Sequence, residues 1–148
     1  MDISRQGHRL LQIGVTLLLL SALLGLAVPQ FAVPRLALSA HLVGILQGLL
    51  LLALGLVWPR LRLGPAQSRI AFWLVVYQSI AAPLSNLLAG AWGAGNSIIP
   101  MAAGAAHGTA AQEAVINAGL RSAGAALIVG LVLILWGLRL GVGPLSRE

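Results

Sequence analysis

One histidine and the glycines after it have the spacing of a cofactor site. His41 is followed by Gly44, Gly48 and Gly55, which fall within about 60° of it at 100° per residue of helix. Imidazole ligates metals, and a glycine face leaves room for a flat macrocycle, so His41 is a candidate metal ligand with Gly44 and Gly48 against the ring. Gly44 and Gly48 also form a G-x-x-x-G pair, which is typical of a helix-packing seam. The residues alone leave both interpretations open.

Amide and hydroxyl side chains supply candidate substrate-binding groups. These candidates are Gln47, Gln78, Ser85, Asn86 and Asn117. Gln47 lies about 9 Å along a helix axis from His41, so it either lines the same cavity or bonds to a neighbouring helix. Tyr77 is a candidate for moving a proton. Pro83 frees a backbone carbonyl near Ser79, so we expect the Ser79 hydroxyl to bond to it.

A carboxylate stands near the start of the last apolar stretch. Glu113, Asn117 and Arg121 follow at i, i+4 and i+8, so they line one stripe of a helix. A carboxylate in a low-dielectric pocket is a natural general acid or base, which makes Glu113 a catalytic candidate. An internal ion pair bridged by Asn117 is the structural alternative, although Glu113 and Arg121 lie about 12 Å apart along the axis.

These residues must be positioned by helices that cross a membrane. The chain has 148 residues, of which 59% are hydrophobic and 8% charged, whereas soluble domains carry about 25% charged residues. A span needs about 20 apolar residues, and the stretches that qualify are residues 10–28, 38–58, 70–92 and 111–138. We predict an all-α integral membrane protein, a four-helix bundle in a single domain. Arg5 and Arg9 resemble the start of a signal peptide, but three further stretches remain, so we keep the first as a helix.

The basic residues indicate how the chain crosses the membrane. All nine are arginines, and the net charge is +6. Those expected on one side are Arg5, Arg9, Arg60, Arg62, Arg69, Arg139 and Arg147. The positive-inside rule therefore predicts a bacterial-type inner membrane protein with both termini in the cytoplasm, and it accounts for the charge without nucleic acid. The absence of cysteine excludes disulfides, thiolate nucleophiles and Cys-ligated metals.

The connection at 93–110 differs from the others. It is long, rich in glycine and alanine, and carries no formal charge. It is either a plain outer loop or a partly re-entrant lid, which is tolerated at membrane depth only where protein covers it.

The polar residues converge on one depth. His41, Asn86, Gln112, Glu113 and Asn117 all fall in the outer half of their spans. Intramembrane polar groups mark functional sites, so we expect one site under the outer leaflet. The residues themselves do not choose between an enzyme, a transporter or channel subunit, and a non-catalytic assembly protein.

Short sequence motifs extend this interpretation. The stretches LSAHLVGILQGLLLLALGLVWPRLRL, AFWLVVYQ, WGAG and IIPMAAGAAHGTAAQE resemble the hydroxylaminobenzene mutase family, over residues 10–139. The resemblance implies an isomerase that converts N-aryl hydroxylamines to aminophenols (hydroxylaminobenzene to 2-aminophenol) in nitroaromatic degradation. The implied partners are a small aromatic substrate and membrane lipid.

That family in turn resembles the styrene oxide isomerases. This second resemblance implies a homotrimer with haem b at the subunit interface, His41 as the ligand of the iron, and ferric iron as a Lewis acid. Gln47 takes the place of an asparagine, Tyr77 that of a carboxylate and Ser85 that of a tyrosine. These departures favour a substrate other than an epoxide, and epoxide isomerisation stays an alternative.

Overall fold

The computed structural model describes residues 3–139. Its elements are α1 (Ile3–Ala27), α2 (Pro34–Val57), α3 (Pro65–Trp92), α4 (Pro100–Ala103) and α5 (Ala110–Arg139), with short 3-10 turns at Val28–Gln30 and Trp58–Arg60. All helices except α4 are long and apolar enough to span a membrane, so the predicted spans in an all-helical chain are confirmed. Proline begins α2, α3 and α4, because its missing N–H and fixed φ suit the first helical position.

The helices extend past the predicted apolar stretches. α1 begins at Ile3 rather than near residue 10, and α3 begins at Pro65 rather than near residue 70. Apolar length measures the crossing of the hydrocarbon core, whereas intrahelical hydrogen bonds continue through the exposed residues Arg5 and Arg9. Arg147, which the topology argument used, lies outside the described residues.

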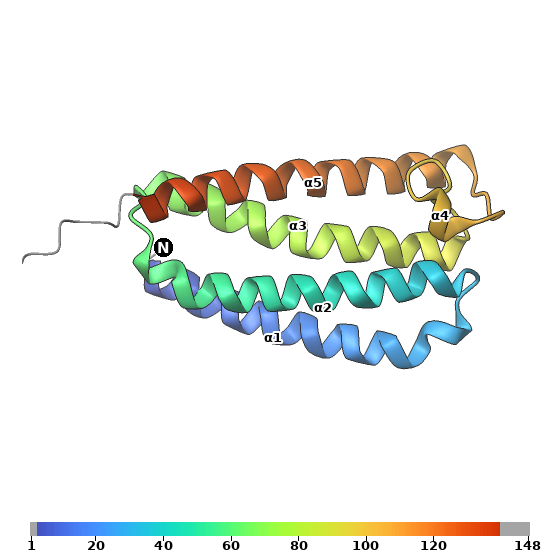
Figure 1. The fold of residues 1–148 in the computed structure, drawn as a ribbon, viewed down its shortest axis with the longest axis horizontal. Helices are drawn as coiled ribbons and strands as arrows, with labels where there is room; N and C mark the ends of the chain where they lie inside the picture. Colours follow the sequence, from blue (N-terminus) through green and yellow to red (C-terminus); the bar gives the residue numbers. More distant parts are fainter. Residues whose placement is uncertain (1–2, 140–148) are drawn as a thin grey trace, which may run out of the picture.

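The long helices form an open row rather than a closed bundle (Figure 1). α2 packs against α1 and α3, and α3 packs against α5, whereas over residues 3–139 α1 and α5 do not pack against each other. The predicted bundle is therefore corrected to a row in the order α1, α2, α3, α5. Short connections make α1–α2 an antiparallel hairpin. The two halves are joined mainly by α2 against α3, with a smaller contact between α1 and α3. The row has two different edges, one formed by α1 and one by α5.

A buried polar network ties three elements together at one end of the row. We name this the basic end, since it carries Arg5, Arg9, Arg60, Arg62, Arg69 and Arg139. The Gln6 Oε1 atom accepts hydrogen bonds from Trp58 Nε1 at 3.0 Å and from Ser68 Oγ at 2.6 Å. The Trp58 ring also packs edge-on against Phe72, with ring centroids 6.3 Å apart. Gln6 thus joins α1 to the end of α2 and the start of α3.

The opposite end is closed by a folded segment at 93–109, which we name the cap. Gly93, Gly95 and Gly104 have φ values of 63°, 107° and 61°, which residues with a Cβ rarely adopt. Asn96 Nδ2 donates to the Gly104 carbonyl oxygen at 2.9 Å. Ala94 and Ala103 of the cap share a buried apolar cluster with Leu36, Ala89 and Ile116. The segment is therefore a packed cap over the ends of α2, α3 and α5.

Candidate active site

His41 lies between α2 and α1, toward the cap end. Its Nδ1 is 2.6 Å from the carbonyl oxygen of Ser21. A carbonyl oxygen only accepts hydrogen bonds, so Nδ1 carries a proton, and in the neutral imidazole Nε2 then keeps its lone pair. The side chain is half-buried, and no residue in the described range bonds to Nε2. One imidazole nitrogen is therefore available to ligate a metal.

The glycines of α2 face α1, on the same side as His41. A Cβ on Gly48 would lie 2.7 Å from Leu18 Cγ, and Gly44 packs directly against the Ser21 hydroxyl. Such close backbone approach is the usual function of a G-x-x-x-G pair in membrane helices. Because α1 covers this face, it offers no open groove to a macrocycle. The expectation that Gly44 and Gly48 lie against a cofactor is corrected to helix packing.

A polar cluster joins α2 to α3 near mid-membrane depth. Gln78 Nε2 donates to Gln47 Oε1 at 2.9 Å and to Ser79 Oγ at 2.8 Å. The Ser79 hydroxyl donates to Gln47 Oε1 at 3.4 Å, so the expected bond to the carbonyl freed by Pro83 is replaced by a side-chain bond. Gln78 and Ser79 are both buried. Their polar groups are largely occupied by one another, which is the structural alternative that the sequence left open for Gln47.

Ser85 and Asn86 are consecutive residues of α3 whose side chains have different surroundings. Ser85 packs directly against Gly119 of α5. Asn86 is only 5% exposed, and its Oδ1 atom has no hydrogen-bond partner within the described chain. A buried carbonyl without a partner is destabilising unless a water or ligand bonds to it. Asn86 therefore carries a buried acceptor that no described residue satisfies.

Glu113 holds the cap through both of its carboxylate oxygens. Its Oε1 atom accepts the backbone N–H of Gly95 at 2.8 Å, and its Oε2 atom accepts the Ser97 hydroxyl at 2.7 Å and the Ser97 N–H at 3.2 Å. The N–H groups of Asn96 and Gly108 complete the set at 3.3 and 3.4 Å. Charge-assisted bonds of this kind anchor a loop. Both oxygens thus bind the cap, and the role of Glu113 as a general acid or base stays a prediction.

The ion pair between Glu113 and Arg121, bridged by Asn117, is not formed. Asn117 Nδ2 donates to Ser97 Oγ at 2.7 Å, which extends the network around Glu113. Asn117 Oδ1 is buried and has no partner among residues 3–139. Arg121 is exposed, and Asn117 bonds to the cap instead of bridging the two charges. The internal ion pair considered from the sequence is thus replaced by a cap network that excludes Arg121.

Tyr77 lies on the α5 side of the row. It is 47% exposed, and its hydroxyl is 2.7 Å from Ser122 Oγ of α5. His41 contacts α1 instead. Within one copy of the chain, therefore, the structure does not bring Tyr77 and His41 together.

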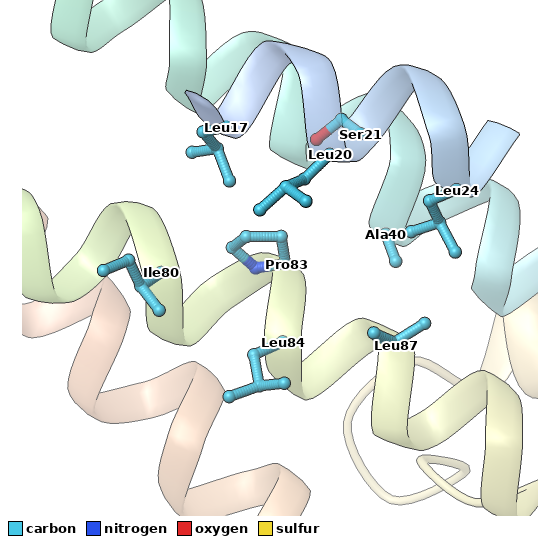
Figure 2. Close-up of a pocket in the computed structure, with 9 residues that line it drawn as sticks. All are labelled: Leu17, Leu20, Ser21, Leu24, Ala40, Ile80, Pro83, Leu84 and Leu87. Carbon is cyan, nitrogen blue, oxygen red and sulfur yellow. The ribbon is translucent and has the colours of Figure 1, made fainter. Parts of the chain in front are cut away.

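An apolar cavity of about 330 Å³ opens between α1 and α3. Figure 2 shows Leu17, Leu20 and Leu24 of α1 facing Pro83, Leu84 and Leu87 of α3 across it. Ser21 and Ala40 also line the cavity. Ser21 bonds to His41 through its carbonyl oxygen, and Ala40 precedes His41 in the chain, so the cavity adjoins His41. Sequence reasoning missed this cavity, since leucines in a span carry no chemical signal. Only Pro83 within a helix marked the place.

A comparison with known families decides the class of the protein. The sequence profile of the styrene oxide isomerases matches residues 6–139. The chain belongs to the styrene oxide isomerase family. It is therefore an isomerase, and its predicted place among membrane isomerases is confirmed.

Two curated relatives of this isomerase carry a more specific name. Hydroxylaminobenzene mutase HabB of Ectopseudomonas oleovorans is 50% identical over 132 residues, which cover 89% of this chain and 80% of that protein. Hydroxylaminobenzene mutase HabA of Ectopseudomonas oleovorans is 38% identical over 125 residues, covering 84% of this chain and 93% of that protein. The resemblance to the hydroxylaminobenzene mutases that the sequence motifs predicted is confirmed, so this isomerase is of the mutase type. No solved structure matches the isomerase.

Proposed function

We propose that this isomerase converts hydroxylaminobenzene to 2-aminophenol. The observation that carries the proposal is the 50% identity to hydroxylaminobenzene mutase HabB over 89% of the chain. The N–O bond breaks, a C–O bond forms at the ortho carbon, and the hydrogen on that carbon leaves as a proton while nitrogen gains one. Substrate and product are isomers, so the reaction needs no oxidant or reductant.

The apolar cavity supports this chemistry. As the N–O bond breaks, positive charge spreads into the ring, and bulk water would then add at the para position. The leucine-lined cavity between α1 and α3 receives the ring and excludes that water. Asn86 does not line this cavity; the buried Oδ1 without a partner in residues 3–139 is what keeps it a proposed substrate-binding residue.

The cofactor that we propose is haem b, held by His41. The donor set fits this group, because the protonated Nδ1 of His41 bonds to Ser21 and leaves Nε2 for iron. Residues 3–139 contain no cluster of three or more His, Cys, Asp or Glu side chains that could hold a bare metal ion, whereas a porphyrin supplies four ligands and needs only one from the protein. When bound, ferric haem supplies a Lewis acid to the hydroxylamine oxygen.

The assembly that we propose is a homotrimer. A closed ring joins two different surfaces of neighbouring copies, and the row offers two different edges. The α5 edge exposes Arg121, Ser122 and Tyr77 within a span, where lipid tails solvate polar groups poorly. A ring that joins the α5 edge to the α1 edge covers these groups. It also brings Tyr77 toward the His41 side of the next copy, where the phenol can move the ring proton.

The location that we propose is the bacterial-type inner membrane, with the basic end in the cytoplasm. α1 begins and α5 ends at that end (Figure 1), which also carries the arginines of the α2–α3 connection. Arginine-rich ends stay on the cytoplasmic side.

Epoxide isomerisation is a second candidate. The match to the styrene oxide isomerase family over residues 6–139 favours it. It shares the apolar cavity and the ligand His41 but needs no N–O cleavage. Offering styrene oxide in place of the hydroxylamine separates the two activities.

The experiment that tests the proposed reaction uses purified, haem-supplemented protein and hydroxylaminobenzene in water enriched in oxygen-18. We expect 2-aminophenol as the product, with unlabelled oxygen, because the cavity keeps solvent out. Formation of 4-aminophenol with labelled oxygen, or turnover of styrene oxide alone, would contradict the proposal.

A further inference from the structure

Gly25 lies directly against the imidazole of His41. A Cβ built on Gly25 would stand 2.7 Å from Cε1 and 2.8 Å from Nδ1 of the ring. Real Cβ atoms do not approach other atoms so closely, so any other residue at this position displaces the imidazole. Glycine inside a helix is destabilising relative to alanine. The close approach of the ring gives a reason for glycine in this turn of α1.

The same turn of α1 supplies the hydrogen bond to His41. In an α-helix the Ser21 carbonyl accepts the N–H of residue 25, and here the same oxygen also accepts the Nδ1–H of His41 at 2.6 Å. The ring therefore lies over Gly25 with Nδ1 on the Ser21 oxygen. A carbonyl partner fixes the tautomer of a ligating histidine and strengthens it as a ligand.

We propose that Gly25 and the Ser21 carbonyl form a seat that holds His41 as its Nδ1–H tautomer and so presents Nε2 to the iron. Gly25 is then a positioning residue that acts through His41. The inference rests on the proposed haem for its consequence at the iron, but the tautomer itself is a property of the chain alone. The Ser21 residue that forms the seat also lines the apolar cavity (Figure 2), so the ligand and the cavity share one wall.

The test compares Gly25→Ala with Gly14→Ala in the full-length protein. Gly14 is also on α1, and a Cβ there would lie 2.9 Å from the Gly48 carbonyl oxygen, so it loosens the same helix pair without touching His41. Loss of such a partner to a ligating histidine weakens metal binding by about 10- to 100-fold. We expect Gly25→Ala to weaken haem binding by that factor and to raise the haem reduction potential. Gly14→Ala should lower the unfolding temperature with the potential unchanged.

A second measurement uses haem-free protein. Nitrogen-15 NMR of labelled histidine separates the two tautomers, and a His41→Ala spectrum identifies the His41 signals. We expect the Nδ1–H tautomer in the wild type and in Gly14→Ala, and its loss in Gly25→Ala. An Nε2–H tautomer in the wild type, or equal haem affinity and potential in both glycine variants, would overturn the seat. A wild type that has the Nδ1–H tautomer but binds no haem would support the seat formed by Gly25 and Ser21 and contradict the proposed cofactor.

Discussion

The Nδ1 atom of His41 lies 2.6 Å from the carbonyl oxygen of Ser21, so a side chain of α2 is held by the backbone of α1. Ser21 also lines the apolar cavity between α1 and α3. The proposed metal ligand and the proposed chamber for the aromatic ring thus meet at one residue. This proximity is what an isomerase needs when a Lewis acid must act on a substituent of an apolar ring.

Filling the cavity should weaken substrate binding. Leu87→Trp places an indole among the residues that line it, and a change in the shape of an apolar pocket alters discrimination by about 10- to 200-fold. We expect KM for hydroxylaminobenzene to rise about tenfold, toward the lower end of that range, with haem content unchanged. Steady-state kinetics measure this. Leu23→Trp is the matched control, since Leu23 is exposed on α1 and does not line the cavity. Equal KM values in the two variants would exclude the cavity as the ring site.

Tyr77 and His41 should act across two copies of the chain. Removing a general acid or base lowers the rate by about 10²–10⁴-fold, and we expect a loss of about 10²-fold in kcat for Tyr77→Phe. Because each copy keeps one of the two groups, co-expression of His41→Ala with Tyr77→Phe should restore activity to mixed trimers. Copies tagged differently and purified in tandem measure this. If both groups act within one chain, mixed trimers stay as inactive as the separate variants.

Glu113 should stabilise the cap without taking part in catalysis. Glu113→Gln turns one acceptor oxygen into a donor that faces the N–H and O–H groups of the cap, and leaving such groups unsatisfied costs about 1–3 kcal/mol. We expect a lower unfolding temperature and faster thermolysin cleavage between residues 93 and 109. Ser97→Ala removes the hydroxyl bond to Glu113 and the acceptor of Asn117 Nδ2. It leaves the carboxylate with its backbone N–H donors from the cap, so its effect should be smaller.

The kinetics of Glu113→Gln separate an anchor from a catalyst. Removing a general acid or base lowers kcat by about 10²–10⁴-fold. If Glu113 only anchors the cap, we expect the kcat of Glu113→Gln, per folded molecule, to stay within about tenfold of the wild type. A larger loss at an unchanged unfolding temperature would restore Glu113 to the catalytic role predicted from the sequence.

Gln6 should stabilise the basic end. In Gln6→Ala the Trp58 indole N–H and the Ser68 hydroxyl lose their acceptor in a buried site, which destabilises a protein by about 1–3 kcal/mol. Reversible unfolding in mixed micelles measures the free energy of unfolding. Gln12→Ala is the control, because Gln12 is exposed on the same helix, and it should have little effect. Equal stability in the two variants would show that the network is dispensable.

The sequence predicts the fold as far as apolar length determines it. Each span is present, because about 20 apolar residues have few alternatives to a membrane helix. The open row was not predictable, since apolar periodicity does not say which lipid-facing surfaces meet. Helix ends also differ, because Ile3 to Arg9 is polar enough to look like a flank and still continues α1.

The candidate site was predictable where chemistry and packing agree. His41 stands out as an imidazole in a span, and its bond to Ser21 is consistent with a ligand. Gly44 and Glu113 show what the sequence does not predict. The spacing of the glycines is equally compatible with a cofactor groove and with a helix-packing seam, and a carboxylate can act as a general base or anchor a loop. Their contacts, α1 for Gly44 and the cap for Glu113, show the packing and anchoring roles that the sequence does not.

His41 is proposed to hold a haem on which the mutase reaction depends. The absorption spectrum of the purified, haem-reconstituted protein tests this when it is taken with and without hydroxylaminobenzene, alongside product formation, for the wild type and His41→Ala. We expect a Soret band that shifts with substrate in the wild type, and the loss of both band and 2-aminophenol in His41→Ala. A His41→Ala protein that lacks haem and still forms 2-aminophenol at the wild-type rate would contradict it.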